Sequence, residues 1–363
     1  MKKHYAPALD GLRAICIIFT ILYHTPGCPS FINGTIGVDI FFALSGWLIT
    51  WLLLEEQSRS TGGLNLKAFY IRRVFRIMPI YYATIILYVV AALVLSKVTG
   101  DAGQKLDNLR VAIVYLLTFN REYAPSGAGT FMSHAWTLGI EEKFYLIWPA
   151  ILYVFARSAF MTFAVSAALI VATVVFLGSY DLVLRGYLGL GFGAALAFWL
   201  HRNHTVRKIF EGHPIASLAA LALVVPYSLS IWFPSTIVWN IAISAISSVM
   251  IASVWLRPNQ PVAKALSFQP LPWLGNLTFS MYMLHVLCMN FVLVLFAKLH
   301  VSEMGFAFFI CLYGMSVLVS WVANIAVERP MIGVGKRLAL RSASAGKASA
   351  GKDVAAISPS VTS

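Results

Sequence analysis

Apolar runs recur along most of the chain, from near residue 8 to residue 328. Each run is about 20 residues long, which at the helical rise per residue suffices to cross the hydrocarbon core of a bilayer. We therefore predict an all-α polytopic membrane protein with ten transmembrane helices. The predicted spans are residues 8–25, 36–54, 77–96, 139–155, 160–178, 183–200, 214–232, 237–256, 277–297 and 305–328.

One apolar stretch is too short to be an eleventh span. Residues 111–119 (VAIVYLLTF) would cover only about 13 Å as a helix. Counting this stretch as a crossing would also reverse the side assigned to every later loop. We predict that residues 97–137 stay on the outer side and contain a re-entrant or interfacial helix near residues 109–120.

The composition agrees with a membrane protein. Hydrophobic residues make up 59% of the chain and charged residues 11%, a balance unlike that of a soluble globular domain. The net charge of +13 could suggest nucleic-acid binding. However, placing both termini in the cytoplasm puts about three quarters of the Lys and Arg residues on the inner side, as the positive-inside rule requires. The charge therefore indicates topology and no nucleic acid.

The two ends of the chain are expected to add no catalytic domain. The first span contains Asp10 and Arg13 and lacks a small-residue cleavage site, so we expect it to remain attached. We expect a transmembrane domain over residues 1–335. The last part of the chain is rich in Ala, Ser and Gly, so residues 336–363 are expected to form a disordered basic cytoplasmic tail. The four cysteines indicate no disulfide framework.

Arg13 and His24 lie at opposite ends of the first apolar run. Their spacing of eleven residues is three helical turns, so both side chains fall on nearly the same face, about 16 Å apart along the axis. Ionisable groups inside a span are costly and point to function by default. His24 considered alone is more often a satisfied polar residue.

A basic cluster enters the third span from the cytoplasmic side, in the segment KAFYIRRVFRIMP. Its members are Arg72, Arg73 and Arg76, and a lone arginine at such a place usually anchors the inner leaflet. Three arginines within five positions favour a second reading. Guanidinium groups bind phosphates through paired hydrogen bonds, so these residues could hold an anionic cofactor.

Glu141 and Glu142 begin the fourth span at the depth at which His24 ends the first. An exposed interfacial pair is an equally ready explanation. A histidine with a nearby carboxylate is, however, the usual arrangement of a general base. We read His285 as structural, and we assign the adjacent Ser45 and Gly46 to close helix packing. The remaining histidines lack metal-ligand spacing, so no metal is expected.

Several blocks together resemble the acyltransferase 3 family of polytopic membrane acyltransferases, which includes O-antigen and exopolysaccharide O-acetyltransferases. The blocks follow the family's order over residues 9–330, and they read LDGLRAICIIFTILYH, GVDIFFALSG, RRVFRIMP, WTLGIEEKFY, LGNLTFSMYMLH and ERP. The family's usual Trp-Ser-Leu is here Trp136-Thr137-Leu138, which keeps a hydroxyl. The resemblance puts the family's essential arginine and histidine on Arg13 and His24. Its glutamate falls on Glu141, and its basic motif falls on Arg72, Arg73 and Arg76.

The resemblance also implies an activity. A cytoplasmic acyl-coenzyme A, most commonly acetyl-coenzyme A, would donate its acyl group to a hydroxyl of a surface polysaccharide or of its lipid-linked precursor. The expected location is the bacterial inner membrane, with membrane lipids as the surroundings. His24 would act as general base assisted by Glu141, with direct attack on the thioester or, alternatively, an acyl-histidine intermediate. Some relatives carry an extra hydrolase-like domain that completes the transfer. We expect this chain to lack such a domain, and therefore to act alone or with a separate partner.

Two other functions stay open at this point. The acceptor could be a small secondary metabolite such as a macrolide. Alternatively, the chain could be a non-enzymatic transporter of anionic solutes, which would also use membrane-embedded charges. Transporters often contain internal repeats, and we detect no second copy of the Arg13 to His24 pattern or of the arginine cluster.

Overall fold

The structure is a computed structural model that describes residues 6–30, 32–59, 64–99, 102–155, 158–177, 181–213, 218, 237–301 and 305–342. Every regular element among these residues is helical, which confirms the predicted all-α class. Seven helices are long and apolar enough to cross a membrane. They are α1 (Pro7–His24), α2 (Ile36–Arg59), α3 (Leu66–Thr99), α7 (Asp181–Arg202), α10 (Ile237–Leu256), α13 (Thr278–Lys298) and α14 (Phe306–Ala323) with its helical continuation to Ser342.

The predicted number of ten spans is therefore larger than the number found among the described residues. Helix α5 (Trp136–Phe155) occupies another predicted span but carries three adjacent charged residues, Glu141, Glu142 and Lys143. Helix α6 (Ala159–Leu177) occupies a further one, and its apolar part is shorter than the seven spans. The predicted span at residues 214–232 lies outside the described residues, apart from residue 218.

Helices α3 and α14 extend beyond their predicted limits. The third span was predicted to begin at residue 77, but α3 begins at Leu66, so the arginine cluster lies inside the helix. Helix α14 passes into a π-helical segment, Asn324–Glu328, which packs against α3. The chain then stays helical to Ser342, so residues 336–342 of the predicted tail are helical and the rest of that tail lies outside the described residues.

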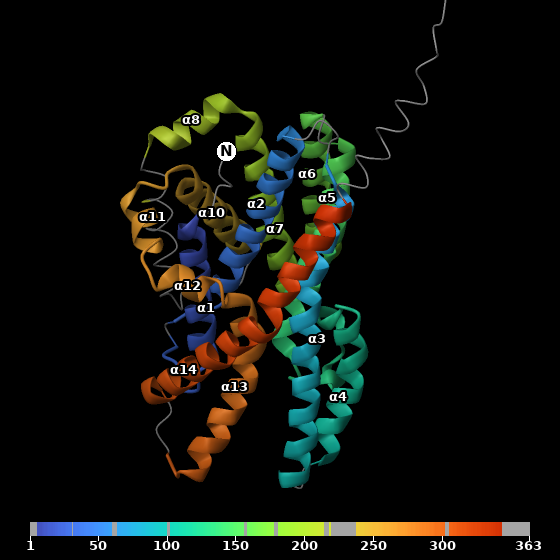
Figure 1. The fold of residues 1–363 in the computed structure, drawn as a ribbon, viewed down its shortest axis with the longest axis vertical. Coiled ribbons are helices and arrows are strands. Elements are labelled where there is room, and N and C mark those ends of the chain that lie inside the picture. Colours follow the sequence, from blue (N-terminus) through green and yellow to red (C-terminus); the bar gives the residue numbers. More distant parts are fainter. Residues whose placement is uncertain are drawn as a thin grey trace, which may run out of the picture.

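The stretch predicted as a one-sided excursion contains helix α4 (Ala102–Leu117) and three short 3₁₀ turns. The turns are η1 (Arg121–Tyr123), η2 (Ser126–Ala128) and η3 (Ser133–Ala135). Helix α4 begins before the predicted residue 109 and packs along α3, where the Tyr81 hydroxyl donates to the Leu116 carbonyl at 2.7 Å. In Figure 1, α4 lies toward one end of the molecule and α8 (His204–Gly212) lies across the other.

Close packing of α1, α2, α7 and α10 forms the centre of the fold. A Cβ atom at Gly46 of α2 would lie 2.1 Å from the Leu190 carbonyl oxygen of α7, so only glycine permits this approach. This agrees with the packing role predicted for Gly46. Helix α1 also packs against α12 (Leu271–Gly275) and α13, which fixes the helix that carries Arg13 and His24 (Figure 1).

Candidate active site

Three arginines line a small cavity, which we call the arginine cavity, with a volume of about 60 Å³. Arg13 comes from α1, and Arg73 and Arg76 come from α3, where their spacing of three residues puts them on one face. Two carboxylates, Glu141 of α5 and Glu328 of the π-helical segment, line the same cavity. With all five groups ionised, the cavity keeps an excess of positive charge.

The arginines differ in whether their guanidinium groups already have partners in the protein. The Arg13 Nη1 atom lies 2.7 Å from Asp10 Oδ1, and the Arg73 guanidinium lies 5.0 Å from the centre of the Tyr145 ring. Arg76 makes no hydrogen bond or ion pair within the described part of the chain, and its side chain is exposed to the cavity. Arg72 points elsewhere and pairs with Glu56 at 3.0 Å, outside the arginine cavity.

Each carboxylate of the arginine cavity is buried and accepts a hydrogen bond from a serine. Glu141 Oε1 accepts from the Ser45 hydroxyl at 2.7 Å, and Glu328 Oε2 accepts from the Ser280 hydroxyl at 2.6 Å. Ser45 thus has a polar role beside the packing role predicted for it. The π-helical turn that ends at Glu328 shifts the register of the long helix, and such turns are frequent at functional sites.

A narrow, mainly apolar space of about 40 Å³, which we call the passage, adjoins the arginine cavity. The two spaces share Glu141 and Thr278 together with the apolar residues Phe41, Leu138 and Phe279. At its other end the passage shares Thr20, Val38 and Tyr282 with a third cavity. The three spaces therefore lie next to one another in a series through the helices, each neighbouring pair sharing a wall.

The third space, which we call the histidine cavity, has a volume of about 460 Å³ and contains His24. The His24 Nδ1 atom lies 2.8 Å from the carbonyl oxygen of Thr20. A carbonyl oxygen can only accept, so Nδ1 carries the proton and Nε2 keeps the lone pair that a general base needs. Glu141 does not line this cavity, and within the described residues no hydrogen bond joins it to His24. Glu142 lines none of the three spaces.

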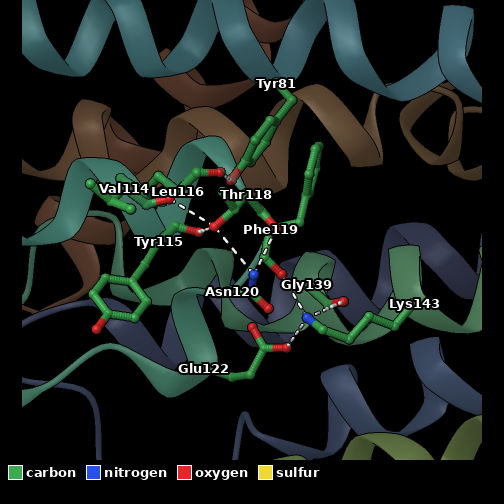
Figure 2. A network of polar contacts seen from close by, with 10 residues as sticks. All are labelled: Tyr81, Val114, Tyr115, Leu116, Thr118, Phe119, Asn120, Glu122, Gly139 and Lys143. Carbon is green, nitrogen blue, oxygen red and sulfur yellow. Dashed lines mark hydrogen bonds and ion pairs between the residues drawn. The ribbon is translucent and has the colours of Figure 1, made fainter.

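The loop after α4 forms one wall of the histidine cavity and is fastened to α5 by Lys143 (Figure 2). The Lys143 ammonium donates to the Phe119 carbonyl at 2.7 Å, to Glu122 Oε1 at 2.6 Å and to the Gly139 carbonyl at 3.2 Å. Burial raises the pKa of Glu122, and the hydrogen bond from Lys143 opposes that rise. A Cβ atom at Gly139 would lie 2.7 Å from the backbone carbonyl oxygen of Phe119 and 2.2 Å from Glu122 Oε2, so the loop approaches α5 this closely because residue 139 is glycine.

Further polar and aromatic groups complete the histidine cavity. Arg185 of α7 donates to both carboxylate oxygens of Asp39, at 2.5 and 3.2 Å, and to the Thr35 hydroxyl at 3.1 Å. Tyr23 and Trp136 add aromatic surface. A pocket that combines paired charges, hydroxyl groups and aromatic rings has many ways to bind a polyhydroxylated molecule through hydrogen bonds and ring contacts.

The structure brings together some of the predicted residues and separates others. Arg13, Arg73, Arg76 and Glu141 share one cavity, His24 lies in another, and Arg72 lies in neither. Four further lining residues have no role predicted from the sequence. These are Glu328, His134, Tyr282 and Arg185. The signal available for Glu328 was a lone carboxylate closing an apolar run, which by itself suggests function.

Comparison with known proteins gives a consistent picture. A family model described as an acyltransferase domain matches residues 7–325. The peptidoglycan O-acetyltransferase of Listeria monocytogenes is 30% identical over 311 residues, covering 78% of this chain and 49% of that protein. A putative peptidoglycan O-acetyltransferase of Bacillus subtilis is 30% identical over 313 residues, covering 77% of this chain and 48% of that protein.

A putative O-acetyltransferase of Staphylococcus aureus strain COL is 29% identical over 320 residues, covering 80% of this chain and 52% of its own length. The chain thus spans about half the length of the curated relatives it matches. No solved structure gives a significant match.

Proposed function

The chain belongs to the acyltransferase 3 family, and on that premise we propose that it transfers an acetyl group from acetyl-coenzyme A to a hydroxyl of a carbohydrate. The observation that carries this proposal is the series of three spaces that leads from the arginines to His24. One end suits a phosphorylated donor, the middle suits a narrow chain, and the far end holds a base in a roomy polar cavity.

Donor binding would use the arginine cavity. Coenzyme A carries several phosphates, and guanidinium groups bind phosphate oxygens through charge-assisted hydrogen bonds. Arg76 is the leading candidate because its guanidinium has no partner within the described residues. Arg73 of the same helix and Arg13 of α1 would add charge to the cavity. We propose that this end faces the cytoplasm, with both termini on that side.

The thioester would then reach His24 through the passage. Arg13 and His24 lie eleven residues apart on α1, or about 16 Å along the helix axis. An extended pantetheine arm is suited to that separation, because it is a slender chain that needs few polar partners inside the passage. This arrangement explains why the basic residue and the histidine occupy opposite ends of one helix.

His24 would act as general base on the acceptor. Its Nε2 atom takes the proton of the acceptor hydroxyl while the oxygen attacks the thioester carbonyl carbon. The carbon–sulfur bond then breaks, the acetyl ester forms, and the thiolate of coenzyme A recovers a proton to become the free thiol. An acyl-histidine intermediate is the alternative, in which Nε2 itself attacks the carbonyl carbon first.

We assign Glu141 a positioning role that differs from the one expected from sequence. Because it lines both the arginine cavity and the passage and binds Ser45, it would balance the arginine charge beside the donor. The tautomer of His24 needs no carboxylate, since the Thr20 carbonyl already fixes it. No metal is required for any of these steps.

The acceptor class rests on the relatives and on the histidine cavity. Two of the relatives are named as peptidoglycan O-acetyltransferases, one of them putatively. The volume of the histidine cavity and its hydroxyl, charged and aromatic lining suit a sugar unit of a glycan or of its lipid-linked precursor. A compact secondary metabolite would meet the same groups and serves as the competing acceptor in the test.

The test is acetyl transfer by the purified chain in lipid nanodiscs. Radiolabelled acetyl-coenzyme A is supplied with a peptidoglycan fragment, a lipid-linked disaccharide or a macrolide, and labelled ester is measured. We expect ester on the glycan acceptors and loss of transfer in a His24→Ala variant that still inserts into the membrane. Absence of both hydrolysis and transfer, with transport of an anionic solute instead, would refute the proposal.

A further inference from the structure

Three histidines from three separate segments form a row of successive ring contacts at the histidine cavity, which His24 and His134 line. The ring centres of His24 and His285 are 5.0 Å apart, and those of His285 and His134 are 5.2 Å apart. The rings belong to α1, α13 and η3, and both contacts are edge to face. His285 therefore connects two rings, His24 and His134, that both line the histidine cavity.

The rings of His285 and His134 keep nitrogens without partners. The His285 Nδ1 atom lies 2.7 Å from the Tyr282 carbonyl and must donate to it, which leaves the lone pair on Nε2. By ordinary hydrogen-bond geometry neither that Nε2 atom nor a ring nitrogen of His134 has a partner within the described part of the chain, although both side chains are buried; the Met283 backbone still lies close enough to His134 to favour its charged form. Burying an unpaired polar atom costs free energy, so a purely packing role would favour apolar side chains here.

The row is held firmly in place by neighbouring groups. The Tyr282 hydroxyl donates to the His134 carbonyl at 2.7 Å and lies 2.9 Å from the Thr137 hydroxyl. Tyr282 is also one of the residues shared by the passage and the histidine cavity. The row thus stands at the junction where a thioester emerging from the passage would meet the acceptor.

The surroundings of His134 keep its ring uncharged. The titratable groups around His134 are Tyr88 of α3, Tyr282 and His285 of α13, His24 of α1 and Arg121 of η1. The two carboxylates that line the same cavity, Asp39 and Glu122, are paired with Arg185 and Lys143. Burial and the neighbouring His24 lower the pKa of His134 to about 3, so this ring stays neutral at pH 7 and retains a free lone pair.

We propose that His285, supported by His134, is a positioning residue that shares the proton which His24 takes from the acceptor hydroxyl. The inference rests on the proposed function. The acceptor O–H bond breaks and its proton goes to His24 Nε2, while the acceptor oxygen bonds to the thioester carbonyl carbon. The carbon–sulfur bond breaks, and the shared proton passes to the departing thiolate. A proton shared with the lone pair of His285 Nε2 would stabilise the charged form of His24 during this interval.

The experiment compares the wild type with His285→Phe, which keeps a flat ring but has no nitrogen. Transfer from acetyl-coenzyme A is measured as kcat, as KM for each substrate, as a pH–rate profile and in mixtures of H₂O and D₂O. We expect kcat to fall roughly 10-fold or more with KM for acetyl-coenzyme A nearly unchanged. The acidic limb of the pH–rate profile should move to lower pH, because the charged form of His24 is no longer stabilised by a neighbouring lone pair. The plot of kcat against the fraction of D₂O should change from curved to linear, because fewer protons move in the rate-limiting step.

Three further variants make the result decisive. His285→Gln, which keeps an acceptor oxygen, should recover part of the lost kcat, and His134→Phe should show a smaller loss. His213→Phe, at the exposed end of α8, is the matched control and should behave as the wild type. A His285→Phe enzyme with kcat within twofold of the wild type and an unchanged pH profile would overturn the inference.

If His285→Phe fails to accumulate in the membrane, the same measurements on His134→Phe test the inference instead. An unchanged kcat and D₂O response in that variant would overturn the inference. A wild-type chain with no acetyl transfer would refute the proposed function and this inference together. Active wild type with equally active variants would overturn the inference alone.

Discussion

Replacing Arg76 by alanine is the sharpest test of the donor site, because Arg72 provides a control four positions away on the same helix. Arg76 lines the arginine cavity without a partner within the described residues, whereas Arg72 lies outside it and pairs with Glu56. The side chains of Arg72 and Glu56 are 39% and 33% exposed. Removing an ion pair with this exposure costs about 0–1 kcal/mol of stability and should not alter donor binding.

The expected magnitude follows from the hydrogen bonds that Arg76 would make. A hydrogen bond to a charged group contributes about 1.5–3 kcal/mol. At 1.4 kcal/mol per tenfold change, loss of the phosphate contact should raise the Kd for coenzyme A roughly 10- to 100-fold. Arg76→Lys, which keeps the charge but not the planar fork, should lie between alanine and wild type.

The assay is isothermal titration of the purified proteins in nanodiscs with coenzyme A, repeated at two salt concentrations. Wild type and Arg72→Ala should bind alike, and Arg76→Ala should bind weakly and with less dependence on salt. Equal Kd values for all three proteins would show that the arginine cavity does not bind the donor. A loss in Arg72→Ala as large as that in Arg76→Ala would refute the assignment of the two arginines.

Three other predictions concern the passage, the loop and pH. Cys16→Trp, which fills the passage, should abolish acetyl transfer in the activity assay while coenzyme A still binds in calorimetry. Gly139→Ala should lower the melting temperature because its Cβ would lie 2.7 Å from the Phe119 carbonyl oxygen. Gly127→Ala, whose Cβ would meet only Val111 at an ordinary 4.0 Å, should leave it unchanged. Equal melting temperatures would contradict the close approach of the loop. The pKa of His134 is lowered from 6.5 in the folded chain, so the unfolded chain binds more protons below pH 6.5. The melting temperature should therefore decline as the pH falls from 6.5, and it should decline less steeply in His134→Phe. Both proteins are followed by scanning fluorimetry across this pH range. If their melting temperatures fall equally with pH, His134 is not a cause of the decline.

Helical periodicity and the cost of burying charge identified much of the candidate site from sequence. They placed Arg13 and His24 on one helix and put Arg73 and Arg76 on a common face, and both residue pairs line cavities in the structure. The same periodicity does not exclude Arg72, which is four positions from Arg76 and therefore only about 40° from it around the helix axis. Grouping all three arginines by proximity in sequence therefore included one that lies outside the cavity.

Depth along the membrane was a weaker guide, because it says nothing about rotation about a helix axis. His24, at the end of the first span, and Glu141, at the start of the fourth, were predicted to lie at a similar depth, yet Glu141 binds Ser45 and lines the arginine cavity. The position of Glu328 depends on a π-helical turn, which the pattern of apolar residues does not predict. The row of three histidines depends on how α1, α13 and η3 pack, which a single sequence does not specify.

The most direct measurement of the central claim is an experimental structure of the chain bound to a thioether analogue of acetyl-coenzyme A. We expect phosphates beside Arg13, Arg73 and Arg76, the pantetheine arm inside the passage, and the acyl end within about 4 Å of His24. An analogue bound at another surface, or one whose acyl end stays far from His24, would contradict the account.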